Sequence, residues 1–228
     1  MEQLKTNYFF DLTQFPHADL FHEISFVWAA LSKIHSFLKS KKLGNIEVDI
    51  PTGVYLVNPE MISIGKGTVL EPGAYIKGPC IIGENCSIRQ GAYIRGDVIT
   101  GNSCVIGHDT EIKNSIMLNR ANAAHFAYVG DSILGNGVNL GAGTKCANLK
   151  FDHSSITIRY NEELINTELK KFGAIIGDGT QIGCNAVTNP GTLIGKNGRW
   201  YPCTNFGGFV AENQIVRSEA RVRISSIK

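Results

Sequence analysis

The stretch CIIGENCSIRQGAYIRGDVITGNSCVIG, residues 80–107, repeats one pattern of residue types every six positions. A large aliphatic residue occupies every sixth position except Thr100, and a mostly small residue precedes it by two positions. The same phase extends in both directions and is occupied by Ile64, Leu70, Ile76, Ile82, Ile88, Ile94, Thr100, Ile106, Ile112 and Leu118. It returns at Leu134 and Leu140, and again from Ile176 to Ile194. A period of six therefore dominates the chain.

This period excludes the two commonest patterns, because an α-helix repeats its apolar residues every 3.6 positions and a simple strand alternates every two. Short strands joined by tight bends, three to a coil, would stack residues about 18 apart. Glycine and asparagine, as in Gly83-Glu84-Asn85, tolerate the positive φ of such bends. The sequence predicts an all-β fold, a parallel β-helix of hexapeptide repeats over residues 46–195. These coils resemble the hexapeptide-repeat family, and that resemblance implies a left-handed helix.

The repeat is interrupted twice and flanked by different sequence. The phase slips between Leu118 and Leu134, and an insertion over about 150–172 alternates around Asn161-Glu162-Glu163, which predicts a hairpin. Within residues 1–45, apolar residues three and four apart predict an amphipathic helix over 18–41. We interpret it as a cap on the open end of the β-helix, with a partner-binding helix as the alternative. Residues 196–228 lose the period and are expected to form a tail that caps the other end or crosses to a neighbour.

The length, charge and cysteine content of the chain limit the classes of protein to which it can belong. The 228 residues suit one main domain, and a formal net charge of +2 does not indicate a nucleic-acid partner. No apolar run is long enough for a membrane span, and no secretion-signal pattern begins the chain, so we expect a cytoplasmic protein. The six cysteines include no pair two residues apart and no histidine cluster, so neither a zinc site nor a disulfide is expected. Cys80, Cys86 and Cys104 fall on the small position of the repeat and should be buried.

Two segments carry a more specific signal, AAHFAYVGD at residues 123–131 and GVNLGAGT at residues 137–144. Together they resemble the acetyltransferase domain of the bifunctional N-acetylglucosamine-1-phosphate uridyltransferase/glucosamine-1-phosphate N-acetyltransferase family, and the related C-terminal domains of sugar-1-phosphate nucleotidyltransferases. The resemblance runs from about Val69 to Gly195. It implies a homotrimer with active sites between neighbours, in which acetyl-CoA is the co-substrate. The implied acceptor is an amino-sugar phosphate, first of all glucosamine-1-phosphate in the pathway to UDP-N-acetylglucosamine.

The resemblance also assigns individual roles. A histidine side chain, with an ordinary pKa near 6.5, suits a general base at neutral pH, and His125 occupies that position with Glu111 as its orienting residue. The substrate-binding positions of the family correspond to Arg89, Lys113, Tyr128, Asn139 and Lys171. The acetyl-CoA positions correspond to Ala142, Asn148 and Cys184. No metal is required for acetyl transfer.

Two departures leave the acceptor open. Leu149 stands where the family commonly has tyrosine, and the insertion lengthens a connection that is short in the family. The chain also has no GxGxxG loop and no room for a nucleotide domain, so any uridyltransferase would be a separate partner. Three other functions stay open: a non-catalytic trimerising or regulatory module, an acyltransferase for another amino sugar, and a γ-type carbonic anhydrase. The last would need three zinc-ligating histidines, for which only His108, His125 and His153 come into question.

Overall fold

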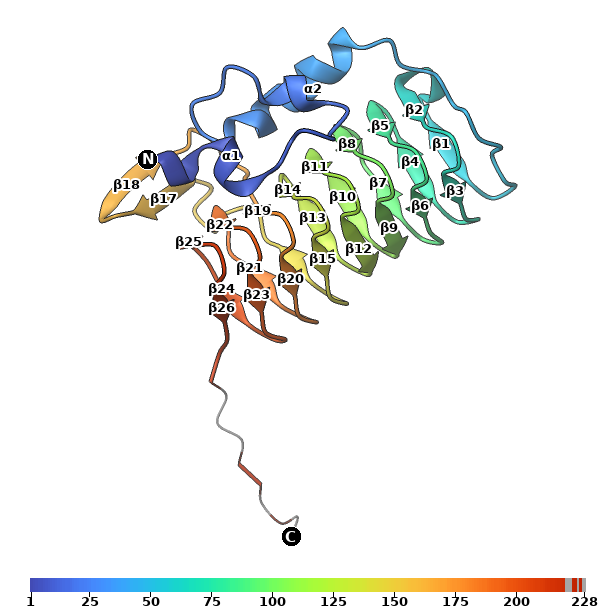
Figure 1. Cartoon of the computed structure of the whole chain (residues 1–228). Coiled ribbons are helices and arrows are strands. Elements are labelled where there is room, and N and C mark those ends of the chain that lie inside the picture. Colours follow the sequence, from blue (N-terminus) through green and yellow to red (C-terminus); the bar gives the residue numbers. More distant parts are fainter. Residues whose placement is uncertain (220–222, 225, 227–228) are drawn as a thin grey trace.

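The chain forms a left-handed parallel β-helix, described by a computed structural model for residues 1–219, 223–224 and 226 (Figure 1). Within these residues, three parallel sheets of eight short strands make its three sides. Sheet A contains β2 (Ile62–Ile64), β5 (Cys80–Ile82), β8 (Val98–Thr100), β11 (Ser115–Met117), β14 (Ile133–Leu134), β19 (Ala174–Ile176), β22 (Thr192–Ile194) and β25 (Phe209–Val210). Sheet B contains β1 (Tyr55–Val57), β4 (Tyr75–Lys77), β7 (Tyr93–Ile94), β10 (Glu111–Lys113), β13 (Tyr128–Gly130), β16 (Lys145–Cys146), β21 (Val187–Thr188) and β24 (Asn205–Phe206). Sheet C contains β3 (Val69–Leu70), β6 (Ser87–Ile88), β9 (Val105–His108), β12 (Asn122–His125), β15 (Asn139–Leu140), β20 (Gln181–Ile182), β23 (Arg199–Trp200) and β26 (Ile215–Val216).

The predicted aliphatic positions line the inside of the β-helix. Ile64 pairs with Ile82 in sheet A, and Ile76 pairs with Ile94 in sheet B, so like residues stack from coil to coil. All four are buried in one inner core. Burying each such side chain contributes about 1.5–3 kcal/mol, and each coil gains it mainly from its neighbours. The predicted fold class is confirmed.

The bends use residues that accept a positive φ. At the corner between sheets A and C, Gly67 has a φ of 70° and Asn85, one coil later, has a φ of 53°. A Cβ on Gly67 would lie 2.3 Å from Asn85 Oδ1, so a larger residue at this position would displace the Asn85 side chain.

The phase slip begins earlier than predicted. Three residues separate Ile94 from Val98, whereas only two separate Ile112 from Ser115, so this coil is one residue shorter. Met117 therefore pairs with Leu134 and joins the inner core. Leu118, predicted at that inner position, packs in a second hydrophobic cluster outside the β-helix.

The N-terminal segment does not cap the open end of the β-helix, contrary to the prediction. It contains η1 (Glu2–Leu4), α1 (Thr6–Phe9), η2 (Ala18–Phe21) and α2 (Ala29–Ser40), and α2 lies along the outer side of sheet A (Figure 1). Leu31 and Ile34 join a hydrophobic cluster with Ile116 and Ile133, which are strand residues of sheet A. The predicted helix begins only at Ala29, and Glu23, with a φ of 55°, interrupts the segment predicted to be helical from residue 18.

The inserted hairpin is confirmed as the antiparallel pair β17 (Thr157–Tyr160) and β18 (Glu163–Asn166). Its Ile158 and Tyr160 belong to the same outer cluster, and Tyr160 Oη donates to Gln3 Oε1 at 2.7 Å. At the end of the insertion, Phe172 is buried with its ring centroid 6.4 Å from that of Trp28. The hairpin and the N-terminal segment thus form one outer layer.

The predicted tail is also corrected, because residues 199–216 continue the β-helix. Trp200 pairs with Ile182 and Val216 and belongs to the inner core. It stands six residues after Ile194, so the period persists with an aromatic residue at the aliphatic position. η3 (Pro59–Met61) completes the described helices, and none of these is long and apolar enough to cross a membrane.

Replacing Ile34 by alanine should lower the free energy of unfolding by about 2–5 kcal/mol, because a buried contact with sheet A is lost and a cavity remains. Urea titration followed by the fluorescence of Trp28, which lies in the same cluster, measures the change. Ser36→Ala, at an exposed position of the same helix, is the control and should change stability by at most about 0.5 kcal/mol. Equal urea midpoints for both variants would contradict the docking of α2 on sheet A.

Candidate active site

Seven turns lie above one another where the chain passes from sheet C to sheet B, and we call this column the C–B corner. Its central turns are Arg89-Gln90-Gly91, Gly107-His108-Asp109, Ala124-His125-Phe126, Gly141-Ala142-Gly143 and Gly183-Cys184-Asn185, with Glu71-Pro72-Gly73 and Tyr201-Pro202-Cys203 outside them. The third residue of each has a positive φ. The turns are joined by backbone hydrogen bonds, from Gly143 N to His125 O at 3.1 Å and from Asn185 N to Ala142 O at 2.8 Å. His125, Ala142 and Cys184 therefore occupy the same position in three successive turns.

His125 ends β12 and is exposed to solvent. It pairs in register with His108 of the preceding coil. The next residue, Phe126, has a φ of 36°, a conformation that is costly for an aromatic residue and is more often found at functional sites. Within the described part of the chain, the His125 ring has no hydrogen-bond partner, so both ring nitrogens are open to a substrate.

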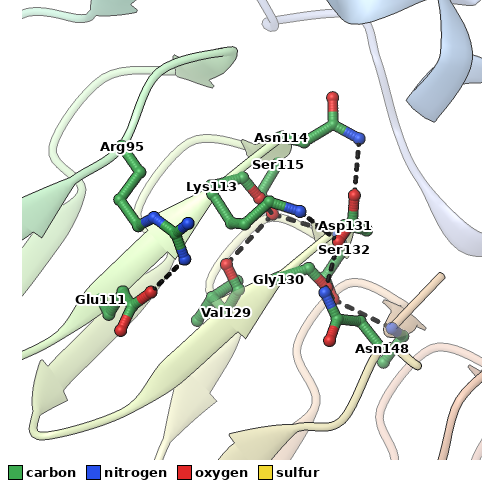
Figure 2. Close-up of polar contacts among 11 residues, drawn as sticks. Arg95, Glu111, Lys113, Asn114, Ser115, Val129, Gly130, Asp131, Ser132 and Asn148 are labelled. Atoms are coloured by element: carbon green, nitrogen blue, oxygen red, sulfur yellow. Dashed lines mark hydrogen bonds and ion pairs between the residues drawn. The ribbon is translucent and has the colours of Figure 1, made fainter. Parts of the chain in front are cut away.

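Glu111 does not orient His125 in this structure. Its Oε1 accepts a hydrogen bond from Arg95 Nη1 at 2.6 Å, within sheet B (Figure 2). The carboxylate is thus paired with a cation on its own side of the β-helix. The orienting role predicted from the resemblance has no supporting contact within this subunit.

Lys113 and Asn148 belong to a polar network at the corner between sheets B and A (Figure 2). Lys113 Nζ lies 2.6 Å from Asp131 Oδ2, Asn114 Nδ2 donates to Asp131 Oδ1 at 2.9 Å, and Asn148 Nδ2 also donates to Asp131 Oδ2. The Asp131 side chain is only 5% exposed and that of Lys113 only 18%, so the two charges largely neutralise each other. Asn148, predicted to contact acetyl-CoA, is separated from Ala142 by the full width of sheet B.

The remaining predicted acceptor residues divide between two sides of the molecule. Tyr128 begins β13 on sheet B, and Lys171 is exposed at the end of the insertion. Arg89 begins the C–B turn that follows β6, and Asn139 begins β15 on sheet C. Burial raises the pKa of Tyr128, so its phenol stays protonated and able to donate a hydrogen bond at neutral pH. One subunit does not gather these four side chains around a single ligand.

A groove of about 270 Å³ lies beside the last two turns of the C–B corner and is lined by Gly183, Tyr201 and Pro202. Another, of about 620 Å³, is lined by Leu149, Phe151 and Pro190, where the insertion leaves the β-helix. The turns that carry His125, Ala142 and Cys184 form an open edge within one subunit.

Lys145 was not singled out from the sequence, although it lies next to the C–B corner. It begins β16, and its Nζ donates to Gly143 O at 2.6 Å. The available signal was positional, because a lysine here follows directly on the GAGT turn of the motif.

The cysteines follow the repeat as predicted. Cys80, Cys86 and Cys104 are buried, as is Cys146, whereas Cys184 and Cys203 are exposed, and all six are free thiols. Burial raises the pKa of Cys80 to about 12 and that of Cys146 to about 11.

Iodoacetamide should alkylate two thiols of the native protein, Cys184 and Cys203, and six after unfolding. The reagent must reach the thiolate, and the other four thiols are shielded from solvent. Shielding alone protects Cys86, because a hydrogen bond with Cys104 lowers the pKa of the Cys86 thiol to about 6. Intact-mass and peptide mass spectrometry count and locate the modifications. Fast native labelling of Cys86 or Cys104 would show that the coils are stacked in a different phase.

Part of the chain is similar in sequence to known proteins. Residues 76–169 match the family described as the GMPPB C-terminal domain. A bifunctional sugar-1-phosphate nucleotidylyltransferase/acetyltransferase of Sulfurisphaera tokodaii is 38% identical over 92 residues, which are 40% of this chain and 23% of that protein. The bifunctional protein GlmU of Methanococcus maripaludis is 33% identical over 180 residues, 77% of this chain and 42% of the relative.

Among solved structures, an Arabidopsis UDP-N-acetylglucosamine acyltransferase aligns over 77% of this chain and 66% of that protein. The sequence identity is 11% and the TM-score is 0.32. The chain spans less than half the length of the two bifunctional relatives. The resemblance to bifunctional sugar-1-phosphate nucleotidyltransferase/acetyltransferase proteins is thereby confirmed.

Proposed function

We propose that the chain is an acetyl-CoA-dependent N-acetyltransferase for an amino-sugar phosphate, with glucosamine-1-phosphate as the first acceptor to test. The observation that carries this proposal is the alignment of His125, Ala142 and Cys184 in three successive turns of one open corner. The proposed base, His125, thus lies in the same row as Ala142 and Cys184, two of the three residues proposed to contact acetyl-CoA. The Sulfurisphaera tokodaii relative is named as an acetyltransferase as well as a nucleotidylyltransferase, which supports the same assignment.

In the proposed reaction, acetyl-CoA supplies an activated thioester. The neutral amine of the sugar attacks the thioester carbonyl, an N–C bond forms, and His125 takes the proton that the nitrogen loses. The C–S bond then breaks, and His125 returns the proton to the departing thiolate, which gives the amide and free CoA. An acyl-enzyme is not needed, because the amine is itself a good nucleophile. Tyr128 offers a hydrogen-bond donor for the sugar.

The division of acceptor residues supports a trimer. Sheet A is covered by the N-terminal segment and the hairpin, so sheets B and C, which meet at the C–B corner, are the sides left for a neighbour. Tyr128 and Lys171 on one subunit could then face Arg89 and Asn139 of the next. A cyclic arrangement would form such a pocket at every interface.

Light scattering on the purified chain should give about three times the 24.8 kDa mass of one subunit at micromolar concentration. The physical reason is that an open corner lacks the enclosed volume that a CoA and a sugar require. A stable monomer under these conditions would contradict both the trimer and the shared site.

Replacing His125 by alanine should lower kcat by roughly 10²–10⁴-fold, the usual effect of losing a general base. Acetyl-CoA affinity should stay nearly constant, because its contacts are assigned to other turns. Thiol release measures the rate, and calorimetry measures CoA binding.

Arg89→Ala is the comparison variant. It should raise KM for a phosphorylated acceptor and leave kcat nearly unchanged, because a phosphate contact already exists in the ground state. Wild-type activity in His125→Ala would remove the proposed base.

One observation favours a second candidate, a non-catalytic trimerising module. Lys113 is neutralised by Asp131, and Glu111 is bound to Arg95, so two predicted site residues are already satisfied within the subunit. Failure of the wild type to bind acetyl-CoA at millimolar concentration would favour this candidate. The carbonic anhydrase and other amino-sugar alternatives are tested by zinc analysis and by a panel of acceptors.

A further inference from the structure

Lys145, to which the family resemblance assigns no role, lies close to the turn of the proposed base, His125. On sheet B it pairs with Tyr128 of the preceding coil, which in turn pairs with Glu111. Lys145 is therefore one coil from Tyr128, the proposed sugar-binding residue, and paired strands are about 4.8 Å apart.

The Lys145 ammonium bends toward the C–B corner. Its hydrogen bond to Gly143 O, at 2.6 Å, attaches it to the turn whose Gly143 N is bound to His125 O. The side chain is exposed and therefore open to a ligand approaching His125. An ammonium has three N–H donors, and the carbonyl uses only one of them.

Unlike Arg95 and Lys113, the cations of the middle coils, Lys145 has no carboxylate partner among the described residues. Arg95 is paired with Glu111, and Lys113 with the buried Asp131. In the part of the chain that the structure describes, no carboxylate oxygen lies within 4.0 Å of Lys145 Nζ. Lys145 therefore contributes an uncompensated positive charge next to His125, whereas Lys113, assigned to phosphate from the sequence, does not.

We propose that Lys145 binds a phosphate group of a substrate held at the C–B corner. This rests on the proposed acetyl transfer for the identity of the substrates, because both glucosamine-1-phosphate and acetyl-CoA carry phosphate. Two free N–H donors and a full positive charge suit phosphate oxygens, which form strong charge-assisted hydrogen bonds with lysine. The hydrogen bond to Gly143 O holds the ammonium on the side of the strand that faces the base.

The test compares Lys145→Met with Lys77→Met. Lys77 is an exposed lysine of the same sheet, on β4, and its removal changes the net charge equally. It lies four coils away, at about 19 Å, so it should not affect a ligand at His125. Initial rates are measured for glucosamine-1-phosphate and glucosamine, each with acetyl-CoA and with S-acetylpantetheine, which lacks phosphate.

Lys145→Met should raise one KM about 10- to 100-fold, the effect of losing a hydrogen bond to a charged group, and Lys77→Met should raise none. If the phosphate belongs to the acceptor, the loss appears with glucosamine-1-phosphate and not with glucosamine. If it belongs to CoA, the loss appears with acetyl-CoA and not with S-acetylpantetheine. Lys145→Arg should restore most of the affinity in either case, whereas a purely structural role would lower the melting temperature and affect all four combinations alike.

Calorimetric titration with CoA and with glucosamine-1-phosphate separates this proposal from the proposed function. In one outcome the wild type releases no thiol but binds one of these phosphate compounds, and Lys145→Met binds it more weakly. That outcome would refute acetyl transfer and support the Lys145 proposal. A Lys145→Met variant with wild-type KM values and affinities would refute the Lys145 proposal and leave acetyl transfer intact. A wild type that neither releases thiol nor binds either compound would overturn both.

Discussion

The stacking of each residue on its equivalent in the preceding coil is the constraint on which this molecule depends. Strands of successive coils pair in parallel, so a residue type that recurs at one phase of the sequence becomes a row in space. Inside, the rows are aliphatic and supply the hydrophobic stabilisation that holds the coils together. At the corners, the rows consist of turns whose geometry is copied from coil to coil. The candidate active site is one of these rows.

A β-helix with a single inner core leaves three outer sides, and the residues on each side decide what covers it. Sheet A presents Ile116, Ile133 and Ile175 outward, and such an apolar row requires a covering layer. The N-terminal segment and the hairpin supply it, with Phe172 buried near Trp28 where the two meet. The insertion thus serves packing on sheet A, while sheets B and C keep exposed side chains.

Stacking also arranges the charges of sheet B. In the middle coils a carboxylate lies close to each of two cations, and the pairs Arg95–Glu111 and Lys113–Asp131 neutralise them. The second pair is largely buried, where an unpaired charge would be strongly destabilising. One coil further, Lys145 follows Tyr128 in the register and has only a carbonyl as partner. A residue type alone therefore does not identify an anion-binding cation, because the neighbouring coil decides whether its charge is available.

The sequence by itself determined the repeat, the all-β class, the buried cysteines and the inserted hairpin, because each depends on local spacing that stacking preserves. The roles of His125, Ala142 and Cys184 were predicted from the family resemblance, and the structure shows that the three residues share one row of turns. Only the tertiary structure decided that α2 covers sheet A and that Met117 replaces Leu118 inside. It alone showed that Glu111 and Lys113 are already paired. These outcomes depend on which side chains meet across about 16 or more residues of sequence, and the spacing of residue types along the chain does not contain that information.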